Sequence, residues 1–206
     1  FHNSGIKNVI VIPLYPQASY STTTSVESDA RKVVTGFPDM KLNFIHEFYH
    51  REGFVKFWAK TIHDHIIKNN YRTPYLVFSA HSIPVSLVKN GDTYQKAIEE
   101  CSKKIAKKSG YDYEVAYQSG MSRGKWIGPD VKERLKALAR AGMDEIVLVP
   151  ISFINENMET LYDMDMDIIP FGKNALGIKK ISRANIPDAD PLFIQLLADI
   201  IRNEET

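Results

Sequence analysis

The sequence has one cysteine, no long apolar run and almost no net charge, and each scarcity excludes a class of protein. The single cysteine, Cys101, excludes an internal disulfide and any cluster held by several thiolates, so we expect no iron–sulfur cluster from this chain. No apolar stretch approaches the roughly 20 residues that a membrane-spanning helix needs. A net charge of +1 gives no electrostatic reason to expect nucleic acid as a partner.

The remaining composition is that of a globular chain. With 206 residues, 44% of them hydrophobic and 25% charged, the chain is long enough to bury a sizeable core in one domain or two small ones. It starts at Phe1 rather than at a methionine, so we expect that part of the N-terminus is missing.

Short apolar runs alternate with segments of helical spacing. In one such segment Phe54, Trp58, Ile62 and Ile66 recur every fourth residue, which predicts the buried stripe of a helix. Strands separated by helices of this length predict an α/β fold with a doubly wound parallel sheet. We expect the stretch 170–191 to be irregular and a last helix to follow it. The expected strands are Val9–Leu14, Lys41–Ile45, Tyr75–Ser79, Glu114–Tyr117 and Ile146–Pro150.

One apolar run stops at a histidine. His81 directly follows the expected strand Tyr75–Ser79 and its neighbour Ala80, and Pro84 then turns the chain away. Ligands of α/β sheets bind at the carboxyl ends of the strands, where this side chain should lie. A neutral imidazole serves there as a base or as a metal ligand near pH 7. Position alone leaves a structural role, as a core histidine bonded to a carbonyl, equally open.

A row of acids follows the last expected strand. Glu159, Asp163 and Asp167 are spaced by four residues, so on a helix they share one face, where like charges cost about 0.2–0.5 kcal/mol per pair. Such a row passes protons or holds a divalent cation. The plainer alternative is an acidic face of a helix in solvent.

Residues 46–50 match a short zinc-peptidase pattern, which suggests an alternative site. Residues 46–50 read H-E-F-Y-H and match H-E-x-x-H, in which a helix places both histidines on one face. Here the pattern directly follows the expected strand Lys41–Ile45, and Gly53 interrupts before the next helix. We therefore treat a zinc site at His46 and His50 as the least favoured hypothesis.

Four segments, in order along nearly the whole chain, resemble the ferrochelatase family, which inserts ferrous iron into protoporphyrin IX. The His81 segment matches the family's S-A-H-S-x-P motif, and the Glu159 segment matches its E-x-L-Y-[DE]-x-D motif. The matching segments are 13–17 with 21–23, 78–84 with 91–94, 117–119 with 126–129, and 150–165.

The resemblance assigns roles residue by residue. It implies that His81 and Glu159 are the catalytic pair, that they bind the metal, and that they face each other across the porphyrin cleft. Asp163 and Asp167 would continue an acidic path for protons or metal away from that pair. The residues that would wall the macrocycle are Tyr15, Trp126 and Phe153.

Some positions depart from the family. Members usually have Asp-His two and three residues before the glutamate, whereas this chain has Glu156-Asn157, which removes a secondary ligand or hydrogen-bond partner. Family members are also longer. We expect one complete domain and a remnant of a second: residues 1–37 as the end of the first domain, 38–175 as the second, and 176–206 as a segment that returns to the first.

The function that the resemblance implies is ferrous iron insertion into protoporphyrin IX, a lyase reaction of haem biosynthesis, with Fe²⁺ as substrate and no tightly bound cofactor. It implies a cytoplasmic protein, peripheral on a bacterial inner membrane or on the matrix side of a mitochondrial one, with a homodimer as a further option. The alternatives are a chelatase for another divalent metal and a non-catalytic tetrapyrrole or metal carrier of the same fold.

Overall fold

The computed structural model describes residues 1–121 and 123–204, and its strands form two separate parallel sheets. One sheet pairs β1 (Asn8–Val11) with β2 (Lys41–Phe44). The other has the strand order β4-β3-β5-β6, with every pair parallel, which confirms the predicted α/β class. Its strands are β3 (Tyr75–His81), β4 (Tyr113–Gln118), β5 (Glu145–Pro150) and β6 (Lys180–Arg183).

Helices cover both faces of the four-stranded sheet, as a doubly wound arrangement requires. Alternate residues of β3 separate the two layers, because successive strand side chains point to opposite faces. Leu76 and Phe78 join the core under α2, α4 and α6, and Val77 joins the core under α5 and η2. The helices are η1 (His2–Ser4), α1 (Thr23–Val34), α2 (Glu52–Lys68), α3 (Val85–Lys89), α4 (Tyr94–Ser109), α5 (Val131–Arg140), η2 (Glu159–Ile168), η3 (Phe171–Ala175) and α6 (Pro191–Glu204).

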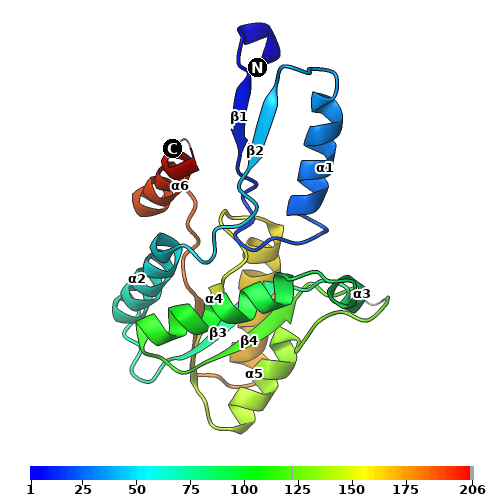
Figure 1. The fold of residues 1–206 in the computed structure, drawn as a ribbon. Coiled ribbons are helices and arrows are strands. Elements are labelled where there is room, and N and C mark those ends of the chain that lie inside the picture. The colour runs from blue at the N-terminus through cyan, green and yellow to red at the C-terminus, as the bar shows by residue number, and fades with distance from the viewer. Residues whose placement is uncertain (122, 205–206) are drawn as a thin grey trace.

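The two-stranded sheet and α1 project from the rest of the molecule (Figure 1). The strand at 41–44 pairs with β1 in this sheet, although the division at residue 38 separates the two strands. The domain division itself stays a prediction. α6 lies against α2, where Phe193 contacts Phe57 with ring centroids 5.5 Å apart.

The expectation that residues 170–191 are irregular is wrong in two places. η3 and β6 lie inside this stretch, and β6 pairs with β5 through Ile146 and Ile181. Ile181 is the single apolar side chain of this four-residue strand, so the sequence shows no alternation that would reveal it.

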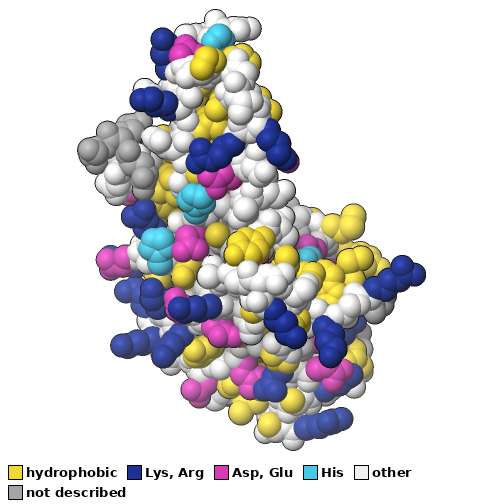
Figure 2. Space-filling model, turned by 45° about the vertical axis from the view of Figure 1, so that its right-hand side comes forward, with side chains coloured by type: hydrophobic (Ala, Val, Ile, Leu, Met, Phe, Trp, Pro, Cys, Tyr) yellow, Lys and Arg dark blue, Asp and Glu magenta, His cyan; other side chains and the backbone are white. Residues whose placement is uncertain are grey.

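Charges of both signs are interspersed over the face that Figure 2 shows, with no large area of one sign. In the described residues, no helix is both long enough and apolar enough to cross a membrane.

Candidate active site at the carboxyl end of β3

His81 is the last residue of β3, a central strand that pairs with β4 on one side and β5 on the other. The strand forms because its five interior side chains are buried. The backbone N–H of His81 donates to Ser152 Oγ at 3.2 Å, and this hydrogen bond fixes the strand end against the loop after β5. The imidazole itself is 41% exposed, so the strand positions it at the surface of the core rather than inside it.

The acid row lies on η2, and Glu159 is the first residue of that helix. His81 Nδ1 and Glu159 Oε2 are 2.8 Å apart, so the structure brings the predicted pair together. It also corrects the implied geometry. A macrocycle cannot lie between two side chains in direct contact; it has to approach the pair from a side on which both are open.

Hydrogen bonds favour the ionised form of Glu159 in this pair. Burial raises the pKa of Glu159, whereas hydrogen bonds from His81 and Ser119 lower it, and the net result is a pKa below the ordinary value. An ionised carboxylate has no proton to give, so Nδ1 of His81 is the donor. With Nδ1 donating, Nε2 is the ring nitrogen left for a proton or a metal.

η2 is a π-helix rather than the α-helix that the spacing by four predicts. The N–H of Ile169 bonds to the carbonyl of Met164, five residues back. The acids accordingly have different partners. Asp163 Oδ2 lies 2.9 Å from Ser119 Oγ, whereas Asp167 lies 2.7 Å from Lys132 Nζ of α5.

The structure reveals a role for Asn157 that the sequence did not indicate. Its Oδ1 accepts hydrogen bonds from the backbone N–H groups of Glu159 at 2.9 Å and Thr160 at 3.3 Å. It therefore caps the helix that presents Glu159. The signal that could have predicted this role is the residue type, because asparagine is a preferred cap.

A cavity of about 220 Å³ opens beside the pair, and both His81 and Glu159 line it. Tyr15 and Phe153, two of the three predicted walls, line it too, and they also line an adjoining cavity of about 320 Å³. Trp126 lines neither cavity. Its Nε1 donates to the carbonyl of Arg123 at 2.9 Å, in the loop between β4 and α5.

His81 and Glu159 are the two predicted metal ligands that the structure brings together. Within residues 1–121 and 123–204, no cluster of three or more His, Cys, Asp or Glu side chains could hold a metal. The zinc-peptidase pattern also fails on geometry. Residues 46–48 are in no helix, and His46 Nδ1 instead lies 3.3 Å from Glu27 Oε2.

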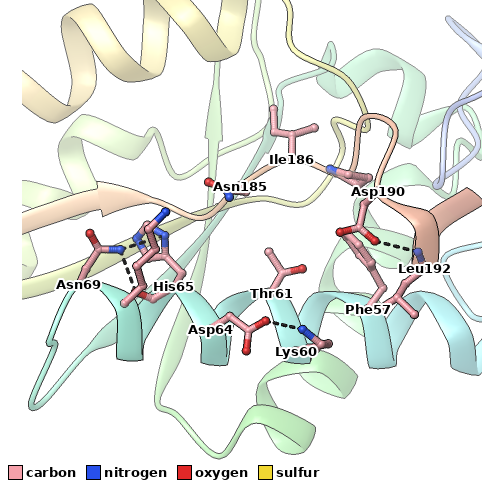
Figure 3. A pocket seen from close by; sticks show the side chains of 12 residues that line it. Phe57, Lys60, Thr61, Asp64, His65, Asn69, Asn185, Ile186, Asp190 and Leu192 are labelled. Atoms are coloured by element: carbon pink, nitrogen blue, oxygen red, sulfur yellow. Dashed lines mark hydrogen bonds and ion pairs between the residues drawn. The ribbon is translucent and has the colours of Figure 1, made fainter.

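Another cavity, of about 350 Å³, lies between α2 and the loop before α6 (Figure 3). Its side chains are already engaged. Lys60 pairs with Asp64, Asp190 accepts from the backbone of Leu192 at 2.8 Å, and His65 Nε2 lies 2.8 Å from Ser182 Oγ. None of the predicted site residues lines it.

Comparison with known proteins decides the family. A family model described as Ferrochelatase matches residues 1–205. The chain belongs to the Ferrochelatase family. The ferrochelatase of Aquifex aeolicus (strain VF5) is 34% identical over 203 residues, which cover 97% of this chain and 65% of that protein. The ferrochelatase of Prochlorococcus marinus (strain MIT 9211) is 35% identical over 208 residues, covering 96% of this chain and 53% of that protein. The chain thus spans between half and two thirds of these relatives.

Solved structures of chelatases share the fold. SirB from Bacillus subtilis with Fe3+ superposes with a TM-score of 0.66 at 14% identity, covering 98% of this chain and 73% of that chain. CbiX is described as the terminal enzyme for biosynthesis of siroheme in denitrifying bacteria. It superposes with a TM-score of 0.63 at 14% identity, covering 94% of this chain and 74% of that chain. At this identity the likeness shows the chelatase type of fold alone.

Proposed function

We propose that the full-length protein inserts ferrous iron into protoporphyrin IX to give protohaem. Membership of the Ferrochelatase family supports this reaction. The observation that carries it is the contact between His81 Nδ1 and Glu159 Oε2 at the wall of a cavity at the carboxyl end of β3. The pair offers an imidazole that is 41% exposed and a carboxylate that fixes it.

Proton removal is the first task of such a site. Insertion of a divalent metal releases the two pyrrole N–H protons. Nε2 of His81 can accept them in turn as a general base, passing the first to solvent before it takes the second. Glu159 keeps the ring in the tautomer with Nδ1–H and stabilises the imidazolium that forms. Ser119 and Asp163 lie directly behind the carboxylate and stay candidates for an acidic path.

Iron is a substrate here, so it must be bound and then released. His81 Nε2 offers a divalent ion one ligand, and Glu159 can add a second only after its carboxylate leaves Nδ1. An ion held by so few ligands keeps most of its coordination positions open, which favours transfer to the four nitrogens of the macrocycle. The cavity of about 220 Å³ is smaller than the roughly 300–1,000 Å³ of common ligand pockets, so only part of the macrocycle enters it. Tyr15 and Phe153 contact that part, and a wall at Trp126 stays an implication of the resemblance.

The test is an anaerobic absorbance assay of the full-length gene product with ferrous iron and protoporphyrin IX. We expect the porphyrin spectrum to convert to that of haem, and His81→Ala to lower turnover by roughly 100-fold or more while porphyrin binding persists. Binding of the pigment without spectral conversion would mean that the protein is a carrier. Conversion with cobalt or nickel, but not with iron, would assign it to another metal.

Dimerisation, peripheral membrane association and the compartment stay predictions of the resemblance. Gel filtration and vesicle sedimentation of the full-length gene product would examine the first two.

A further inference from the structure

The carboxylate of Glu159 receives hydrogen bonds from the ends of two neighbouring strands. His81 Nδ1 lies 2.8 Å and Ser119 Oγ lies 2.7 Å from the same oxygen, Oε2. His81 ends β3, and its partner in register on β4 is Gln118, the residue before Ser119. The parallel pairing of β3 and β4 therefore delivers both donors to one point.

Ser119 adopts a backbone conformation that serine rarely takes. Its φ is 60°, in the left-handed region, and the other non-glycine residues with positive φ in the described chain are Asn70 and Asp188, of types that tolerate it. Such strain costs on the order of 1–3 kcal/mol and persists where the surroundings enforce it. Here it turns the hydroxyl back toward η2, where Ser119 Oγ also lies 2.9 Å from Asp163 Oδ2.

Gln118 precedes Ser119, is the register partner of His81 and is only 2% exposed. Its Oε1 accepts a hydrogen bond from the fully buried Ser79 Oγ at 2.7 Å, which fixes the orientation of the amide. The amide nitrogen, Nε2, has no hydrogen-bond partner within the described part of the chain. It is nevertheless close enough to Glu159 to help lower the pKa of that carboxyl. A buried amide without a partner is costly, so its place beside the carboxylate needs a reason.

We propose that Gln118 and Ser119 are positioning residues that lock the Glu159 carboxylate against His81. Ser119 donates to the carboxylate, Gln118 supplies a second oriented N–H group behind it, and Ser79 keeps that amide from flipping. Because Glu159 in turn fixes the tautomer of His81, the two residues determine which imidazole nitrogen carries the proton and which keeps its lone pair. The inference rests on the proposed function, and it adds to it the residues that hold the reacting pair in place.

Two variants of the full-length gene product test this. Ser119→Gly removes the hydroxyl and relieves the left-handed strain, so folding is not impaired. Gln118→Glu keeps the shape of the side chain and turns a donor into a carboxylate facing Glu159. Asn70→Gly is the matched control, because it places glycine at another left-handed position, at the end of α2 and away from the site.

We expect turnover to fall roughly 10- to 100-fold in both variants, as on loss of a partner behind a metal ligand, with the KM for porphyrin and iron within about twofold. Asn70→Gly should match the wild type. Wild-type turnover in both variants would overturn the proposal, as would a raised KM at unchanged turnover, because that pattern would place both residues in substrate binding.

A second measurement does not depend on turnover. The imidazole ¹⁵N signals of His81 should show the tautomer with Nδ1–H in the wild type and a mixture of tautomers in both variants. An unchanged tautomer in both would overturn the proposal. A wild-type protein that inserts no metal would remove the proposed function, whereas the ¹⁵N signals would still decide the role of Gln118 and Ser119.

Discussion

Glu159 and Asp167 belong to one row of acids on η2, but they lie at its two ends and differ in exposure and in partners. At the start of the helix, Glu159 is 30% exposed and is held by two donors, His81 at the end of β3 and Ser119 directly after β4. Toward its end, Asp167 is 52% exposed and pairs with Lys132 on α5. The difference shows that spacing places acids on a helix, whereas the neighbouring elements decide which groups each of them contacts. Glu159, which meets the carboxyl ends of the strands, is the acid of this row that contacts the imidazole of His81.

The sharpest way to break this comparison is Glu159→Gln. A neutral amide cannot replace the ionised acceptor of His81 Nδ1–H and Ser119 O–H, so we expect iron insertion to fall roughly 100-fold or more. Steady-state haem formation measures it. Glu133→Gln, on the exposed face of α5, is the matched control and should stay within about twofold of the wild type. Equal activity of the two variants would contradict the assignment of Glu159.

Arg183→Ala tests whether the ion pairs of Arg183 hold η2 in place. Arg183 is 11% exposed and pairs with Asp165 of η2 through Nε at 2.7 Å and with Glu156 at 3.0 Å. Its loss leaves two partly buried acids unpaired, so we expect the free energy of unfolding to fall by about 1–3 kcal/mol. Urea denaturation measures the change. A loss no larger than that of Lys179→Ala, a surface pair with Asp144, would show that Arg183 does not hold the helix.

Asp163→Asn and Asp167→Asn compare an acid that shares a partner with Glu159 and an acid that pairs with Lys132. Asp163 shares Ser119 with Glu159, so we expect its variant to lose roughly tenfold in turnover and the Asp167 variant to lose less. Parallel kinetics of the two proteins provide the measurement. The reverse order would show that the path runs to the end of the helix, as the spacing by four predicts.

The smallest effect should come from Lys132→Ala. The pair that it removes is at the surface, so we expect the free energy of unfolding to change by less than about 1 kcal/mol. Thermal unfolding at low and high salt would show a difference that shrinks with salt. A larger, salt-independent loss would mean that the contact of Lys132 with the Phe171 ring, 5.4 Å from its centroid, dominates.

The central strands and α2 could be predicted from the sequence because their buried residues form continuous apolar runs or a regular stripe. β3 and β5 are apolar runs buried on both faces, and the stripe from Phe54 to Ile66 is the buried face of α2. β6 was missed because it is short and has one apolar residue. The π-helix was missed because a spacing by four does not distinguish it from an α-helix.

The candidate site could be predicted from the sequence only in part. His81 and Glu159 were found from a strand end and a motif, and the structure places them in contact. Ser119 and Gln118 were not found, because their role depends on the register of β3 with β4 and on a left-handed backbone at Ser119. Neither property shows in the local pattern of residues.

A structure of the full-length protein with bound protoporphyrin IX would test the central claim most directly. We predict that the macrocycle covers the cavity between Tyr15 and Phe153, with a pyrrole nitrogen at hydrogen-bond distance, roughly 3 Å, from Nε2 of His81. A macrocycle bound elsewhere, or an Nε2 that faces away from its nitrogens, would contradict the account.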